Sequence, residues 1–130
     1  MTRPAPAITD DEVDAAFVPL AAYDVIVIAV SGGPDSLALL QLIADWKRRQ
    51  RYEGEVHVAT VDQGLRAQSA AEAPFVAGRA AALGLPHATL VWTGAKPATA
   101  IAKNARDARY ALLAGHAANV SRGRSAAVAT

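Results

Sequence analysis

Short apolar runs alternate with longer amphipathic stretches along most of this chain. Four apolar runs bounded by turn residues are typical of strands, and they cover residues 25–30, 55–61, 87–92 and 125–130. Apolar residues at helical spacing predict three longer helices, over residues 36–49, 69–84 and 98–120. This alternation predicts an α/β fold with a doubly wound parallel sheet and right-handed crossovers.

Two of these segments predict where the core lies. The first run, V-I-V-I-A-V, contains no polar residue, so we expect a strand that is buried on both faces. The last helix carries a stripe of apolar and small residues that should face the core: Ile101, Ala105, Ala108, Leu112 and Gly115.

Composition is that of a globular protein. Hydrophobic residues make up 52% of the 130 residues, and a net charge of +1 gives no global field to attract nucleic acid. The absence of cysteine excludes disulfides, thiolate zinc sites and a cysteine nucleophile within this sequence. Residues 1–22 predict a leader and a short helix with a capping box at Thr9 and Glu12, without the apolar segment of a signal peptide. No apolar run could span a membrane, so we expect a cytoplasmic protein with no membrane partner.

A six-residue polar loop joins the first strand to the next helix: Ser31, Gly32, Gly33, Pro34, Asp35 and Ser36. Such turns are where α/β folds bind ligands. The two glycines can take positive φ and lack a Cβ, so a bulky anion can reach their main-chain N–H groups. The start of the helix adds free N–H groups and about half a positive charge from the helix dipole. Pro34 suits the first helical position, and the negative charge of Asp35 suits the positive end of the dipole. The loop therefore predicts an anion cradle built from neutral dipoles.

The spacing excludes the two common phosphate loops. The Walker pattern requires a Lys-Ser or Lys-Thr pair, and the dinucleotide fingerprint requires Gly-x-Gly-x-x-Gly; neither is present here. Two alternatives remain open from the residues alone. One is a phosphate cradle of another kind, and the other is a strand–turn–helix corner whose glycines serve geometry only.

The loop resembles the pyrophosphate-binding loop (PP-loop) of the N-type ATP pyrophosphatases, Ser-Gly-Gly-x-Asp-Ser, and Pro34 at the variable position is similar to the tRNA(Ile)-lysidine synthases. These enzymes cleave ATP between its α and β phosphates. The resemblance implies a Rossmann-like domain of the adenine nucleotide alpha hydrolase type, with strand order 3-2-1-4. It also implies that the loop from Ser31 to Ser36 binds the nucleotide, that Asp35 is catalytic, and that Asp35 could ligate Mg²⁺.

Residues 61–66 are similar to the Val-Asp-His-Gly-Leu-Arg stretch of lysidine synthases, which borders the nucleotide. This resemblance implies that Asp62 accepts a hydrogen bond from ribose or adenine and that Arg66 contacts phosphate. Gln63 stands at the usual histidine and cannot titrate near neutral pH, which puts an acid–base role there in question. A turn stabilised by Asp and Gly is the alternative.

Residues 101–110, with an Ala-Arg-x-x-Arg-Tyr core, resemble the helix that follows the third strand in lysidine synthases. This makes Arg106 the first candidate for phosphate or tRNA contact and Arg109 the second. Ala102 replaces a glutamate that is common in the family, which weakens an inferred acidic contact to the amino acid or metal. A solvated basic face of a helix is the alternative.

A second basic cluster, at residues 47–51, ends the helix that follows the loop. The helix returns antiparallel to its strand, so this cluster should lie about 21 Å from the loop, at the opposite edge of the sheet. We expect its cations to offset the negative helix end, with Asp45 pairing Arg49.

The resemblance implies an ATP-dependent ligase that adenylates the wobble cytidine of tRNA(Ile) and joins lysine to it, with ATP and Mg²⁺ as cofactors. The alternatives are another PP-loop ATP pyrophosphatase, such as a tRNA thiolase or an amide-forming synthetase, and a non-enzymatic nucleotide-binding module. Residues 23–130 would form the N-terminal part of the nucleotide-binding domain, ending after its fourth strand. We therefore expect these 130 residues alone to bind ATP weakly and to catalyse nothing. In the complete protein tRNA(Ile) and lysine would bind, and a homodimer is left open.

Overall fold

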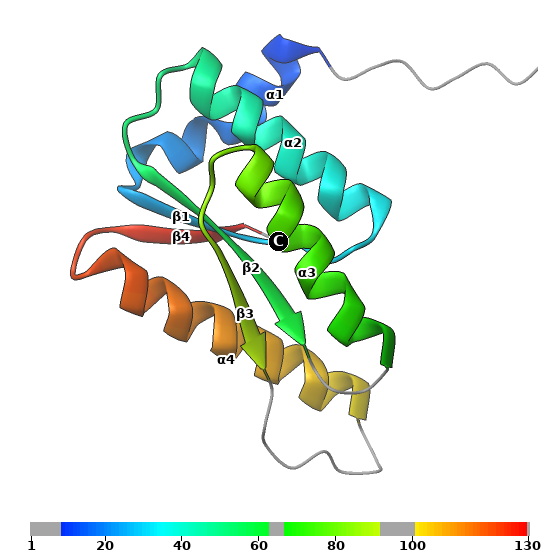
Figure 1. Cartoon of the computed structure of the whole chain (residues 1–130). Coiled ribbons are helices and arrows are strands. Elements are labelled where there is room, and N and C mark those ends of the chain that lie inside the picture. The colour runs from blue at the N-terminus through cyan, green and yellow to red at the C-terminus, as the bar shows by residue number, and fades with distance from the viewer. Residues whose placement is uncertain (1–8, 63–66, 92–100, 130) are drawn as a thin grey trace, which may run out of the picture.

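A four-stranded parallel sheet forms the centre of the molecule. The computed structural model describes residues 9–62, 67–91 and 101–129. The described strands are β1 (Val25–Ala29), β2 (Glu55–Asp62), β3 (His87–Val91) and β4 (Ala126–Ala129). Their order is β3-β2-β1-β4, all parallel (Figure 1), which confirms the predicted fold class and strand order. Strand order reverses beside β1, which pairs with β2 on one side and with β4 on the other.

Helices cover both faces of this sheet (Figure 1). The helices α2 (Pro34–Arg49) and α3 (Ala67–Ala82) lie on one face, and α4 (Ile101–Ser121) lies on the other. Before β1 come a short helix α1 (Asp10–Phe17) and a 3₁₀ segment η1 (Val18–Ala22). The predicted capping box is confirmed, because the Glu12 N–H donates to Thr9 Oγ1 at 3.2 Å. None of the described helices is long and apolar enough to cross a membrane.

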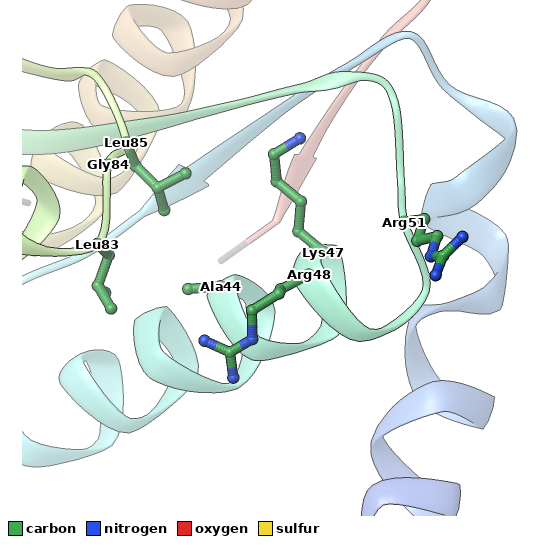
Figure 2. A pocket seen from close by; sticks show the side chains of 7 residues that line it. All are labelled: Ala44, Lys47, Arg48, Arg51, Leu83, Gly84 and Leu85. Carbon is green, nitrogen blue, oxygen red and sulfur yellow. The ribbon is translucent and has the colours of Figure 1, made fainter.

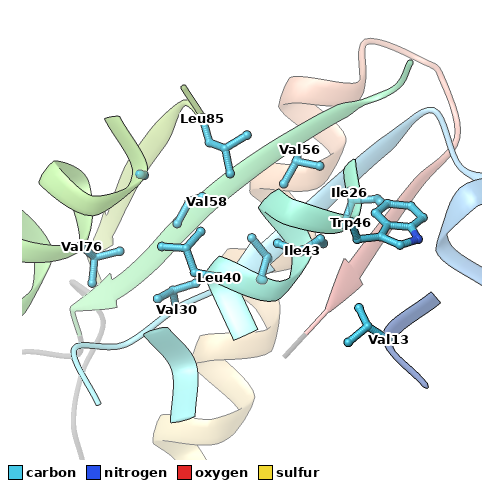
Figure 3. Close-up of a cluster of buried hydrophobic side chains, with 12 residues drawn as sticks. Val13, Ile26, Val30, Leu40, Ile43, Trp46, Val56, Val58, Val76 and Leu85 are labelled. Atoms are coloured by element: carbon cyan, nitrogen blue, oxygen red, sulfur yellow. The ribbon is translucent and has the colours of Figure 1, made fainter. Parts of the chain in front are cut away.

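Strand β1 supplies both layers of the core, as its unbroken apolar sequence predicts. Every residue of β1 is buried, and successive side chains point to opposite faces. Ile26 and Ile28 join the larger cluster, with side chains from α2 and α3 (Figure 3). Val27 and Ala29 join the smaller cluster beneath α4. The loop of residues 31–36 therefore starts from the most deeply buried strand of the sheet.

The buried face of α4 differs from the predicted stripe. Among the described side chains of α4, the buried apolar ones are Leu113 and Ala117, which pack on the small side chains of β1 and β2. Leu112 is only half-buried, and Gly115 is exposed. At its described positions the predicted stripe was wrong, because adjacent leucines in an alanine-rich helix allow two neighbouring faces; the side chains of Ile101 and Ala105 lie outside the described residues. Packing against the sheet selects the face that Leu113 leads.

Ion pairs join the end of α2 to α1. Arg49 forms an ion pair with Asp14 of α1 and a longer one, at 3.4 Å, with Asp10. Asp45 instead pairs with Arg48 at 3.1 Å. The predicted Asp45–Arg49 pair was therefore wrong. Because α1 packs beside the end of α2, it offers Arg49 a carboxylate from outside its own helix.

Candidate nucleotide-binding site

The loop of residues 31–36 lies where β1 ends and α2 begins (Figure 1). Gly33 is the N-cap of α2 in an extended conformation, and Pro34 is the first helical residue, the position that suits proline. The helix thus begins two residues before the predicted start at residue 36. Ser31 Oγ donates to Ser36 Oγ at 3.1 Å and accepts from the Gly33 N–H at 3.3 Å. The N–H groups in the first turn of any helix have no intrahelical acceptor. Here no side chain caps them either. Those N–H groups, with the helix dipole behind them, form a site that suits an anion.

The two loop glycines serve a different purpose from the one that their conformational freedom suggests. Gly33 has a φ of −74°, and among the described residues the glycines with positive φ are Gly84 and Gly123. The loop therefore does not use the freedom of glycine to take positive φ. Space is the reason at Gly32, because a Cβ there would lie 2.9 Å from Cγ of Glu72 on α3. A larger residue at position 32 would therefore require the Glu72 side chain to move.

A hydrogen-bond network that sequence reasoning missed holds the start of the loop. Thr60, 2% exposed on β2, donates its hydroxyl hydrogen to the carbonyl oxygen of Val30 at 2.9 Å. Because that hydrogen is used, His87 Nε2, 2.9 Å from Thr60 Oγ1, is the donor to the hydroxyl. Burial lowers the pKa of His87, which favours a neutral ring. The only signal in the sequence is a single hydroxyl among the apolar residues of this strand.

Asp62 ends β2 at the same edge of the sheet as the loop. Its side chain is half-buried, and in the register of the sheet it lies opposite Val91 of β3. Gln63 and Arg66 lie outside the described residues. The contacts predicted for Asp62 and Arg66 with the nucleotide therefore stay predictions.

The two arginines predicted on α4 occupy different positions relative to the loop. Arg109 lines a small cavity of about 40 Å³ together with Ser31 and the ends of β1 and β2. Its side chain is half-buried, whereas that of Arg106 is exposed. The structure thus brings Arg109 to the first residue of the loop, from the face of the sheet opposite α2. Sequence reasoning ranked Arg106 first because it lies nearer the helix start.

Carboxylates near the loop suit a metal that arrives with its ligand. Among the described residues, no group of three or more His, Cys, Asp or Glu side chains could hold a metal ion. Mg²⁺ usually binds through one or two carboxylates, with phosphate oxygens and water as its other ligands. Asp35, in the first turn of α2, is a carboxylate of this kind. The donor set fits Mg²⁺ bound to nucleotide phosphates better than a permanently held ion.

A larger hollow, of about 310 Å³, lies at the opposite edge of the sheet and is unrelated to the loop (Figure 2). It lies between the end of α2 and the turn after α3, and three cations line it: Lys47, Arg48 and Arg51. Lys47 Nζ donates to the carbonyl oxygens of Tyr52 and Gly54, each at 2.9 Å. This cation is thus used to hold the turn that leads into β2. The cluster lies away from the loop, as the helix geometry predicts.

A neighbouring hollow of about 340 Å³ contains a charged network that joins β2 to the end of α4. Glu55 accepts from Arg124 and lies 2.9 Å from His57 Nε2. Arg124 first, and His57 second, hold the pKa of Glu55 at about 2. Burial, and to a lesser extent the neighbouring His57, lowers the pKa of His116. The geometry is that of a structural ion pair, since Glu55 is already satisfied by two partners.

Comparison with known proteins shows the family of this chain. The sequence profile described as a PP-loop domain matches residues 8–123. The chain therefore belongs to the PP-loop domain family. We refer to residues 31–36 as the PP-loop, because their sequence resembles the loop for which the family is named.

The similar curated proteins are more specific. The chain is 50% identical over 108 residues to a tRNA(Ile)-lysidine synthase of Rhodopseudomonas palustris, covering 83% of this chain and 31% of that protein. It is 54% identical over 86 residues to a tRNA(Ile)-lysidine synthase of Ruegeria pomeroyi, covering 66% of this chain and 20% of that protein. The chain thus spans about a third or less of the relatives it matches.

A solved structure has a similar fold at low identity. The U34-tRNA thiolase NcsA from Methanococcus maripaludis, solved with its [4Fe-4S] cluster, matches with a TM-score of 0.68 at 13% identity. The match covers 86% of this chain and 40% of the thiolase chain. At this identity the likeness shows a shared fold.

Proposed function

We propose that this chain is the ATP-binding part of an enzyme that adenylates the wobble cytidine of tRNA(Ile) and joins lysine to it. The observation that carries the proposal is the PP-loop between β1 and α2, in a chain 50% identical to a lysidine synthase over 108 residues. The proposal includes lysine and tRNA(Ile) as substrates, ATP and Mg²⁺ as cofactors, and a cytoplasmic location.

The chemistry follows from what the loop can stabilise. Attack on the α-phosphorus of ATP by the cytidine transfers AMP to the base and releases pyrophosphate, and the lysine amine then displaces AMP. The first-turn N–H groups of α2 are fixed dipoles that would hold the β and γ phosphates as negative charge builds up on the leaving pyrophosphate. Ser31 and Ser36 add hydroxyl groups to this cradle, and their mutual hydrogen bond orients them.

Two further side chains have defined parts in this proposal. Asp35 would hold Mg²⁺ directly or through water, and the metal would screen the phosphate charge. Arg109, beside Ser31, would supply a cation to the phosphates from the α4 side of the sheet. Both lie near the carboxyl end of β1, the strand beside which the strand order reverses and where open α/β sheets bind ligands.

The test measures tRNA(Ile)-dependent release of pyrophosphate and incorporation of labelled lysine by the complete protein. We expect both activities in the wild type, and a loss of both in Asp35→Ala and Ser36→Ala. Arg79→Ala, which replaces an exposed residue on α3, is the matched control and should keep both activities. Undiminished turnover in both loop variants would overturn the assignment.

An acceptor screen separates the proposal from its alternatives. Pyrophosphate release supported by ammonia or a sulfur donor, but not by lysine, would assign another PP-loop ATP pyrophosphatase. Nucleotide binding without cleavage under every condition would assign a non-enzymatic module. The 130-residue chain itself should bind ATP weakly and form no lysidine, and lysidine formation by this chain alone would contradict that expectation.

A further inference from the structure

Glu72 on α3 covers the first glycine of the PP-loop. An ideal Cβ at Gly32 would lie 2.9 Å from Glu72 Cγ, 3.3 Å from its Cβ and 3.4 Å from its carboxyl carbon Cδ. The Glu72 side chain therefore packs on Gly32 through its Cγ methylene, with its carboxyl carbon within 3.4 Å of the same point. Glu72 is half-buried, so its position follows from the packing of α3 against the sheet.

A carboxylate at this position opposes the binding of a bare anion. Among the described residues no cation forms an ion pair with Glu72. Two like charges about 6 Å apart repel by roughly 1 kcal/mol at an effective dielectric constant between those of water and a protein surface. The loop N–H groups attract phosphate while Glu72 repels it, and a cation between them would turn that repulsion into attraction.

We propose that Glu72 is a positioning residue that makes nucleotide binding by this loop depend on Mg²⁺. Its aliphatic part fixes the loop by packing on Gly32, and its carboxylate disfavours metal-free ATP while accepting hydrogen bonds from water on the metal of the magnesium complex. Mg²⁺ commonly keeps several waters and uses few protein carboxylates, which suits a half-buried glutamate beside a phosphate site. This inference rests on the proposed function, since it assumes that the loop binds ATP.

The experiment measures ATP affinity by isothermal titration calorimetry, once with Mg²⁺ and once with EDTA. Glu72→Gln keeps the length and packing of the side chain and removes its charge. We expect metal-free ATP to bind this variant about threefold to tenfold more tightly than the wild type, and the gain from Mg²⁺ to shrink by about tenfold. Glu72→Asp keeps the charge and should retain most of the metal dependence.

Glu53→Gln is the matched control, because it removes the same charge from an exposed glutamate in the turn between α2 and β2, at the opposite edge of the sheet. It should leave both affinities as in the wild type. Equal metal dependence in the wild type and Glu72→Gln, with ATP still bound, would overturn this inference alone. Failure of the wild type to bind ATP under either condition would instead count against the proposed function.

Discussion

The buried hydroxyl of Thr60 on β2 donates a hydrogen bond of 2.9 Å to the carbonyl oxygen of Val30, one residue before the PP-loop begins. The same hydroxyl accepts from His87 on β3, so three neighbouring strands are joined at the base of the loop. The loop therefore starts from a fixed main-chain position.

Replacing Thr60 with valine should destabilise the protein with almost no change in shape. The change removes one hydrogen bond to Val30 and leaves the His87 donor without its acceptor, which should lower the free energy of unfolding by about 1–3 kcal/mol. Urea unfolding followed by circular dichroism measures the loss. Thr60→Ser keeps the hydroxyl and should retain most of the stability that the valine variant loses. Equal stability of the valine variant and the wild type would contradict this network.

The two PP-loop glycines should differ in their tolerance of alanine. At Gly32 a Cβ would lie 2.9 Å from Glu72 Cγ, so Gly32→Ala should cost about 1–3 kcal/mol through overpacking. At Gly33 the nearest atom is Ser31 Oγ, at an ordinary 3.5 Å, and φ is −74°, so Gly33→Ala should change stability by less than about 1 kcal/mol. Thermal or urea unfolding of the two variants gives the comparison.

A double variant identifies the cause of the Gly32 effect. If the clash with Glu72 is responsible, Gly32→Ala should cost markedly less in a Glu72→Ala background than in the wild type. Additive losses would show that the alanine at position 32 disturbs something else.

The sheet could be predicted because its signals are local. The unbroken apolar run of β1 predicts burial on both faces, and the bounds of the other strands follow from their turn residues. The strand order came with the resemblance that the PP-loop and the two later motifs carry. That Pro34 suits a first helical position likewise depends on residues adjacent in sequence, so it was visible before the structure.

The surroundings of the loop could not be predicted in the same way. Which of Arg106 and Arg109 reaches Ser31 depends on how α4 is rotated against the sheet, and alanine-rich sequence leaves that rotation open by one position. The contact of Glu72 with Gly32 depends on the approach of two helices on one face. Such relationships are set by packing between distant segments, which local patterns do not encode.

The ion pair between Glu55 and Arg124 should make the stability of the protein measurably sensitive to acid. Arg124, followed by His57, holds the pKa of Glu55 at about 2, below its ordinary 4.5. A depressed carboxyl pKa stabilises the folded state above the unfolded pKa, and the contribution is lost as pH falls from 4.5 through about 2. Because Glu55 is exposed, solvent screening keeps the contribution small.

Unfolding free energies of the wild type and Glu55→Gln, measured from pH 6 to pH 2 in about half-unit steps, test this expectation. The wild type should lose more stability than the variant between pH 4.5 and 2, because the variant has no carboxyl group to protonate there. Parallel curves over that window would show that the pair with Arg124 does not form in solution.

Arg109 should matter more than Arg106 for nucleotide affinity. Arg109 lines a small cavity together with Ser31, whereas the side chain of Arg106 is exposed. Of the two arginines, Arg109 is therefore the one that lies beside the loop. A charged hydrogen bond to phosphate contributes about 1.5–3 kcal/mol, so Arg109→Ala should weaken ATP binding by roughly tenfold to a hundredfold. The corresponding loss in Arg106→Ala should be several times smaller. Calorimetric titration with ATP and Mg²⁺ measures both.

Arg109→Lys separates charge from geometry at this position. A lysine keeps the positive charge but lacks the planar fork that can bind two phosphate oxygens, so we expect an affinity between those of the wild type and Arg109→Ala. Arg79→Ala removes an exposed arginine from α3 and should bind ATP as the wild type does. An Arg109→Ala variant that binds ATP normally, while Arg106→Ala does not, would place the phosphate contact near the start of α4, and the cavity beside Ser31 would then have only a packing role.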